Sequence, residues 1–199
     1  KNFNSLFDIA KAKSEIIDNI IENGSIVLNA DDKFYNYFKS KAQNRNLKII
    51  SFSRKKKSNI QLSKIKSFKN KSIIKINING RSKNFIIKRN LEFYLENILA
   101  SIAVISNYLD LDNINEKFFF NYNLPQGRGD HKYIKIKKKK IHLIDESYNS
   151  NPLSLKFALN NFSKLNSQSK RKIILIGDML ELGKFSKKLH LEAAKIVNN

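Results

Sequence analysis

The residues of this sequence best suited to chemistry are two carboxylates and several amides that follow an apolar run. The segment Leu143–Pro152 reads Leu-Ile-Asp-Glu-Ser-Tyr-Asn-Ser-Asn-Pro, so that Asp145 and Glu146 stand where a predicted strand ends. Open α/β sheets form their binding sites from polar residues at the carboxyl ends of strands. The same residues are also typical of a loop rich in asparagine turns, followed by a helix that begins at Pro152.

A second polar segment, Gly177–Gly183, follows another apolar run and reads Gly-Asp-Met-Leu-Glu-Leu-Gly. It is followed by Lys184 and therefore resembles a phosphate-binding loop at first sight. That loop requires four residues between its glycines and a Ser or Thr directly after the lysine. Here five residues separate the glycines and Phe185 follows the lysine, so we do not assign ATP binding to this segment.

Three other side chains stand at positions that could carry function. Lys13 falls within the apolar stripe of a predicted helix, where a lysine that extends its ammonium to solvent is the ordinary interpretation. Asn97 lies in another predicted helix and is, by itself, typical of a helix surface. Arg128 stands between two glycines, where a guanidinium could reach phosphate oxygens with a bidentate fork, although an ordinary basic turn has the same composition.

The elements that must position these residues follow an α/β pattern. Alternating strand and helix signals near the start predict a β-α-β unit with parallel strands, and Asn79-Gly80 predicts a tight hairpin. Residues 53–72 are basic and predict a loop or a weak strand. The predicted elements are helix 5–23, strand 25–29, helix 31–44, strand 47–52, hairpin strands 73–78 and 81–87, and helices 91–109 and 114–120.

We place a domain boundary at Leu124-Pro125, which divides the chain into 1–124 and 125–199. The second part is predicted to contain a hairpin around the lysines 137–140, formed by strands 133–136 and 141–144. A helix at 153–165, a strand at 172–176 and a last helix that includes 189–197 follow. The fold class is therefore α/β in both parts.

Composition excludes a disulfide-stabilised protein and a membrane-spanning one, and it leaves a nucleic-acid-binding module as an alternative. The 199 residues contain no cysteine, and no apolar stretch approaches the ~20 residues of a membrane span. We expect a monomeric cytoplasmic protein without a signal peptide. The net charge of +21 keeps a non-enzymatic nucleic-acid-binding module as an alternative, but the lysines are spread among Asn and Ile, as in A+T-rich coding sequences, and we expect no specific nucleic acid partner. His131 and His142 lack metal-ligand spacing and are interpreted as structural or surface residues.

Taken together, the two polar segments and the Gly-Arg-Gly at Arg128 resemble the Mur ligases, most of all the type that adds D-alanyl-D-alanine to UDP-N-acetylmuramoyl-tripeptide. The resemblance implies a mostly parallel P-loop-type central sheet at 1–124 and part of a Rossmann-like C-terminal domain at 125–199. It implies an ATP-dependent amide ligase of peptidoglycan precursor synthesis. A ligase of the folylpolyglutamate synthase type remains an alternative within the same superfamily.

The resemblance also implies roles for single residues. Lys13, in the segment Ile9–Ile16, is similar to the lysine that Mur ligases carry as a carbamate, which would bind Mg²⁺ near the ATP γ-phosphate. Phe93-Tyr94 replace a His-Asn pair of the family, and Glu146 replaces an Asp. The implied nucleotide-binding residues are Asn97, Arg128, Asp145 and Glu146, and the implied substrate-binding residues are Tyr148, Asn149 and Asn151.

The phosphate-binding loop that the family places before the Lys13 helix does not occur in this sequence. We therefore expect the chain to correspond to the later part of the central domain and the first part of the C-terminal domain. On this interpretation residues 1–199 have no ligase activity by themselves.

Overall fold

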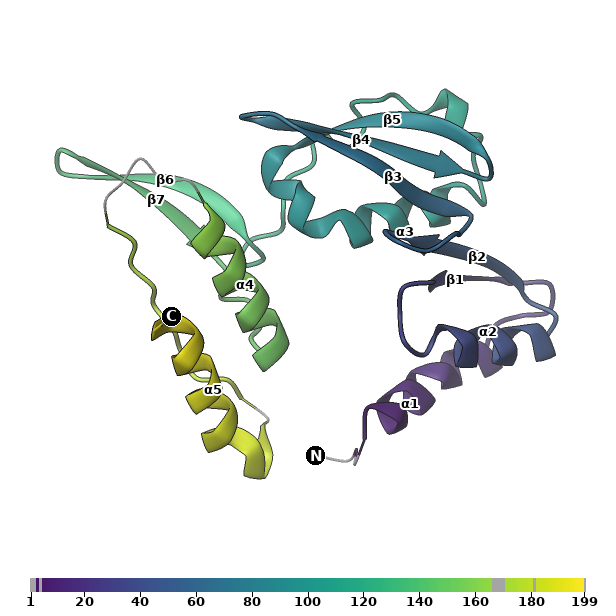
Figure 1. Ribbon diagram of the computed structural model, residues 1–199, viewed down its shortest axis with the longest axis horizontal. Helices are drawn as coiled ribbons and strands as arrows, with labels where there is room; N and C mark the ends of the chain where they lie inside the picture. Colours follow the sequence, from purple (N-terminus) through teal and green to yellow (C-terminus); the bar gives the residue numbers. More distant parts are fainter. Residues whose placement is uncertain (1–2, 4, 166–170, 181, 199) are drawn as a thin grey trace. The chain divides into compact units, whose positions relative to one another are not determined.

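The computed structural model describes residues 3, 5–165, 171–180 and 182–198 (Figure 1). The chain divides into two compact units, Asn2–Tyr122 and Asn123–Asn199, and each is described by itself. Both units combine helices and strands, so the predicted α/β class is confirmed. No described helix is both long enough and apolar enough to span a membrane.

The first unit is built on a mixed sheet whose strands lie in chain order. β1 and β2 are parallel, as are β2 and β3, whereas β4 is antiparallel to both of its neighbours. In Figure 1, β1 and β2 lie between α2 and α3. Its elements are α1 (Leu6–Asp18), β1 (Ser25–Asn29), α2 (Tyr35–Asn44), β2 (Lys48–Ser53), β3 (Ile60–Ser67), β4 (Lys71–Ile78), β5 (Arg81–Lys88), η1 (Arg89–Tyr94), α3 (Leu95–Ile105) and η2 (Leu111–Asn113).

The first helix begins as the sequence predicts and ends earlier. Ser5 and Asp8 form a reciprocal capping box, in which the Ser5 hydroxyl accepts the Asp8 N–H at 3.1 Å. The helix ends at Asp18 because the Asn19 side-chain amide donates to the Glu15 carbonyl, which a further helical turn would have used. Its buried side includes Ile17, which packs with residues of α2 and β2.

The hairpin of β4 and β5 confirms the Asn-Gly prediction. Asn79 and Gly80 have φ angles of 49° and 92°, the positive values that a two-residue hairpin turn requires. The basic stretch before it contributes β3, a full strand paired with β4. Ile60 at the start of β3 is completely buried, which explains why a strand forms in a segment of low apolar content.

The predicted helix at 114–120 is wrong. The Asn115 side chain accepts the Lys117 N–H at 2.8 Å, a local turn that competes with a helix. The Glu116 carbonyl accepts the Ile86 N–H of β5 at 2.8 Å, so this segment covers the sheet edge instead. The helix predicted from residue 91 likewise begins as the 3₁₀ turn η1, and α3 follows from Leu95.

The second unit consists of β6 (Asp130–Ile136), β7 (Lys139–Asp145), α4 (Pro152–Lys164), η3 (Gly183–Phe185) and α5 (Ser186–Asn198). The hairpin turn is tighter than predicted, because Ile136 pairs with Lys139 and only two lysines connect the strands. α4 packs against α5. The predicted strand at 172–176 is wrong: the segment pairs with no strand among the described residues, and a strand needs a partner for its backbone groups.

Candidate functional site

Arg128 and Tyr148, twenty residues apart in the sequence, are in direct contact in the second unit. The guanidinium carbon of Arg128 lies 4.3 Å from the centroid of the Tyr148 ring, the geometry of a cation–π contact. Both side chains are exposed. The tyrosine ring therefore restricts the orientation of an accessible guanidinium, whose fork-shaped donors suit phosphate or carboxylate oxygens.

Backbone contacts hold the turn that carries Arg128 against the loop that carries Tyr148. The Tyr148 N–H donates to the Gly127 carbonyl at 3.0 Å, and the Gly129 N–H donates to the Asp145 carbonyl at 2.8 Å. Gly127 has φ +73°, and a β-carbon at that position would lie 3.0 Å from the backbone nitrogen of Tyr148. A side chain here would be strained by the positive φ and crowded by Tyr148, so glycine suits the close approach of the two sequence motifs.

Asp145 uses its carboxylate to order the loop that follows β7. Its Oδ1 accepts both the hydroxyl of Ser147 at 2.6 Å and the backbone N–H of Ser147 at 3.0 Å. These two hydrogen bonds lower the pKa of Asp145 below its usual value, and the carboxylate is charged at neutral pH. Glu146 beside it is exposed. The loop thus presents two acidic side chains near the Arg128 turn.

Asn151, which the sequence resemblance implies as a substrate-binding residue, has a structural role in this chain. Its Oδ1 accepts the N–H groups of Leu153 and Ser154, at 3.0 and 2.9 Å, and so forms the N-cap of α4. Pro152 occupies the first helical position, as the sequence predicts. Asn149 is exposed in the same loop, three residues after Glu146.

The second polar motif is held by His190 of α5. Its Nε2 accepts the Met179 N–H at 3.1 Å, and its Nδ1 donates to the Ser186 carbonyl at 2.8 Å. Met179 is buried, whereas Asp178 is exposed. Residue 181 of this motif lies outside the described residues. Within the described part, the motif is a loop fixed to a helix by an imidazole with both nitrogens engaged.

Lys13 and Asn97 belong to the first unit, whereas Arg128 and the loop after β7 belong to the second. Lys13 is exposed on α1, and the buried positions of that helix are Ala10, Ser14 and Ile17. Asn97 is exposed on α3 and its carbonyl accepts the Ser101 hydroxyl. The exposed setting of Lys13 leaves its amine accessible to carbon dioxide and to a metal ion.

The role of Asp31 is not apparent from the sequence, where it is the first residue of the predicted helix 31–44. The Asp31 carboxylate follows β1 and accepts the backbone N–H groups of Arg54, Lys55 and Lys56, at 2.6, 3.2 and 3.2 Å. It thereby fixes the basic loop after β2, at the carboxyl ends of two parallel strands. Because the donors are backbone N–H groups, which almost every residue has, the side chains of the loop give no signal of this contact.

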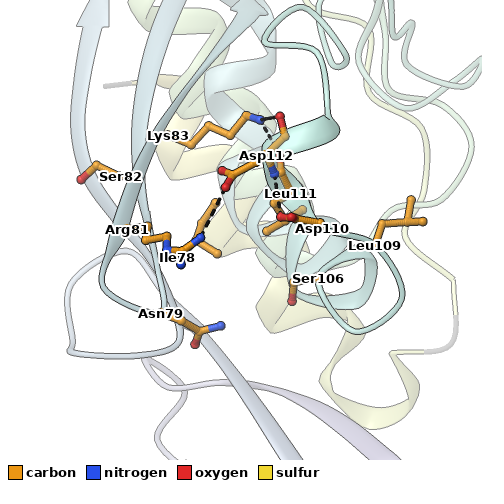
Figure 2. A pocket seen from close by; sticks show the side chains of 10 residues that line it. All are labelled: Ile78, Asn79, Arg81, Ser82, Lys83, Ser106, Leu109, Asp110, Leu111 and Asp112. Carbon is orange, nitrogen blue, oxygen red and sulfur yellow. Dashed lines mark hydrogen bonds and ion pairs between the residues drawn. The ribbon is translucent and has the colours of Figure 1, made fainter.

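A hollow in the first unit has a volume of about 370 Å³ and is lined by none of the residues predicted to bind nucleotide, metal or substrate (Figure 2). It lies between the β4–β5 turn and the end of α3. Lys83 extends toward the backbone at Leu111 and donates to the Asp112 carbonyl at 3.0 Å. Arg81 lies 3.4 Å from the Asp112 carboxylate. Because these polar groups contact one another, the hollow offers few converging donors or acceptors for a ligand.

The residues can be tested for their fit to a nucleotide and a magnesium ion. The exposed Arg128 guanidinium suits a phosphate, and a carbamate on Lys13 would supply the hard oxygen ligands that Mg²⁺ prefers. Among the described residues, no group of three or more His, Cys, Asp or Glu side chains is placed to hold a metal.

Comparison with known proteins gives consistent matches. A family model described as the Mur ligase middle domain matches residues 1–105. A curated relative, the UDP-N-acetylmuramoyl-tripeptide–D-alanyl-D-alanine ligase of Rickettsia prowazekii (strain Madrid E), is 31% identical over 192 residues. The match covers 96% of this chain and 41% of that protein, so the chain spans about two fifths of its length.

Two solved structures have the same fold. A crystal structure of MurF from Acinetobacter baumannii superposes with a TM-score of 0.80 and 22% identity, over 99% of this chain and 41% of that one. A MurF ligase from Thermotoga maritima in complex with ADP gives a TM-score of 0.77 and 20% identity, over 100% of this chain and 43% of that one. At sequence identities of 20–22%, this similarity shows a shared fold and nothing further.

Proposed function

The chain belongs to the Mur ligase family, and from this premise we propose that it serves in the ATP-dependent addition of D-alanyl-D-alanine to UDP-N-acetylmuramoyl-tripeptide. The observation that carries the proposal is the contact between the Arg128 turn and the Asp145–Tyr148 loop. The Arg128 turn and the Asp145–Tyr148 loop, which the sequence resemblance relates to this chemistry, lie in contact with each other. The two units, divided near residue 123, would be the later part of the central domain and the first part of the C-terminal domain.

In the proposed reaction, ATP supplies the phosphoryl group that activates the tripeptide carboxylate for attack by the dipeptide amine. Arg128 would neutralise phosphate charge, because a guanidinium oriented by an aromatic ring loses little further freedom on binding. Asp145 and Glu146 would lie toward the nucleotide and its magnesium ion. Asn97 would contact the nucleotide from the first unit.

Lys13 is proposed to hold magnesium as a carbamate. Carbon dioxide adds to the neutral amine, a C–N bond forms, and the proton lost from nitrogen goes to solvent. The exposure of Lys13 supports this assignment because carbon dioxide and a magnesium ion can both reach its side chain. Tyr148, Asn149 and Asn151 are proposed to face the two peptide substrates, in addition to the contacts that Tyr148 and Asn151 make within the loop.

The decisive experiment is a ligation assay on the protein encoded by the whole open reading frame that contains these residues. ADP release should require UDP-N-acetylmuramoyl-tripeptide and D-alanyl-D-alanine together. Release that requires glutamate and a folate instead would assign the chain to the folylpolyglutamate type and contradict the proposal. Residues 1–199 alone should be inactive, because they contain no phosphate-binding loop.

A matched pair of variants tests the lysine. Lys13→Gln should lower the ligation rate by about 100-fold or more, the effect of losing a group that stabilises transition-state charge. Lys11→Gln, an exposed lysine two residues earlier on the same helix, should retain the rate. Isotopically labelled bicarbonate should give a carbamate signal by NMR that disappears only in Lys13→Gln. Equal losses in both variants would contradict the role of Lys13.

A further inference from the structure

The hairpin of β6 and β7 brings together two histidines that stand eleven residues apart in the sequence. The register pairs Tyr133 with His142 and His131 with Ile144, so the two imidazoles are diagonal neighbours on one face of the hairpin. His142 Nε2 lies 3.1 Å from His131 Nδ1. This pairing depends on the two-residue turn, which the sequence does not reveal.

We propose that His131 and His142 form a two-histidine binding site for a borderline divalent transition-metal ion such as Ni²⁺, Zn²⁺ or Cu²⁺. Imidazole nitrogens are preferred ligands of these ions and poor ligands of Mg²⁺. The histidine pair would therefore not be a ligand of the magnesium ion of the proposed ligation. It requires neither ATP nor the peptide substrates.

The nitrogen separation fits one shared ion. Two imidazole nitrogens at about 2.0–2.1 Å from a metal, at angles between octahedral and tetrahedral, lie about 2.9–3.4 Å apart. The observed 3.1 Å falls inside that interval. The rings need only turn so that both lone pairs point to the ion, which replaces the proton they share. Water fills the other coordination positions, since the described residues offer no third ligand of the usual kinds.

The surroundings hold the two rings in place. Tyr133 stacks on His142, with centroids 4.7 Å apart and an angle of 15° between the rings. Burial, and then the neighbouring His142, lower the pKa of His131, although Asp130 acts in the opposite direction. A ligand pair that is already close together before the ion arrives binds at a lower entropic cost.

The charges around the pair moderate the affinity. Lys140 lies over Tyr133 at 4.6 Å, and Lys135 is its partner across the hairpin. The Asp130 carboxylate beside His131 is paired with Lys132 at 2.9 Å. These cations repel a divalent ion, so binding depends on the chelate formed by both imidazoles. Loss of either ring should remove it.

The test is calorimetric titration of the untagged 199-residue chain with NiCl₂ at neutral pH. The wild type and Lys135→Gln, a variant of the same face, should bind Ni²⁺ with equal affinity. His131→Gln and His142→Gln should each weaken binding by about tenfold or more, at least the effect of losing an outer-shell partner. Affinities unchanged by both histidine substitutions would overturn the proposal, as would a wild type that binds no tighter than the double variant.

A second measurement does not depend on variants that fold. Paramagnetic Ni²⁺ should broaden the ring NMR signals of His131 and His142 at concentrations that leave His190 sharp. His190 is a suitable internal reference because both of its ring nitrogens are already hydrogen-bonded. Equal broadening of all three histidines, or of none, would contradict a site at the hairpin.

Discussion

At Gly127 the backbone of one motif passes so close to the other that an added side chain would be crowded. The φ of +73° is strained for any L-residue, and a β-carbon would press on both the backbone nitrogen and the β-carbon of Tyr148. The Arg128 guanidinium stacks on the same tyrosine. The position of the Arg128 guanidinium therefore depends on the glycine at position 127.

Gly127→Ala should destabilise the second unit by about 1–3 kcal/mol, the cost of a non-glycine residue in a left-handed conformation. Gly177→Ala is the matched control, since Gly177 lies in the same unit with no atom within 4 Å of its added β-carbon and no positive φ. Thermal denaturation followed by circular dichroism measures both. Equal stability of the two variants would show that the close approach to Tyr148 does not exist.

Glu92 offers a pH-dependent test in the first unit. Partial burial would raise the pKa of its carboxyl, but the hydroxyls of Ser67 and Ser72 and the guanidinium of Arg89 outweigh burial and lower the pKa below 4.5. The ionised form is therefore favoured by folding. Its contribution is fully present above the unfolded pKa near 4.5 and is lost as pH falls through the lower folded value.

Accordingly, Glu92→Gln should lower the free energy of unfolding by about 1–2 kcal/mol at pH 7, and the difference from wild type should shrink below about pH 4. Urea denaturation at several pH values measures it. Glu22→Gln, an exposed carboxyl of the same unit, is the control and should have little effect. A Glu92→Gln deficit that stays constant down to pH 3 would contradict the assigned hydrogen bonds.

Among the elements, the loop after β2 is held by one side chain, that of Asp31 at the end of β1. Asp31→Ala removes the acceptor of three backbone N–H groups, those of Arg54, Lys55 and Lys56. Their amide hydrogen exchange should accelerate by about tenfold or more, since one lost hydrogen bond to a charged group exceeds about 1.4 kcal/mol. Asp32→Ala, whose carboxylate accepts the Phe34 N–H, should leave these amides unchanged.

The elements also show what a sequence can and cannot predict. Local signals sufficed for the start of the first helix at Ser5, for the Asn79-Gly80 turn and for the helix that begins at Pro152, because each is decided by neighbouring residues. The segment 114–120 has an apolar pattern suited to a helix, but its backbone bonds to β5, a partner that no local pattern specifies. The strand predicted at 172–176 likewise depends on a partner.

The candidate site follows the same rule. The sequence suggests Arg128 and Asp145 as site residues, whereas their arrangement depends on the register of β6 and β7. That register also joins His131 to His142, which looked unrelated at eleven residues apart. Motif spacing identifies residues of one continuous segment, and contacts across a hairpin require the exact length of its turn.

For the molecule as a whole, the two units differ in how much they bury. Nearly all buried hydrophobic side chains of the described residues belong to the first unit, and the second contributes Leu159 and Met179. A small core supplies little stabilisation against chain entropy. Calorimetry should therefore show two transitions, with the second unit unfolding at the lower temperature.

The variants above make that prediction specific. Glu92→Gln should shift only the upper transition, and Gly127→Ala only the lower one. A single transition displaced by both substitutions would mean that the chain unfolds as one cooperative body.

The uncovered segment 172–176 has a practical consequence for handling the protein. Leu175 is 93% exposed and Ile173 66%, in an extended stretch that can pair with the same stretch of another molecule. At low ionic strength the charge of +21 keeps molecules apart but also attracts stray polyanions such as RNA. At 1 M salt the screening length falls to about 3 Å, the polyanions dissociate, and the molecules can aggregate. Purification should thus succeed only within a window of intermediate salt, which Leu175→Lys would widen.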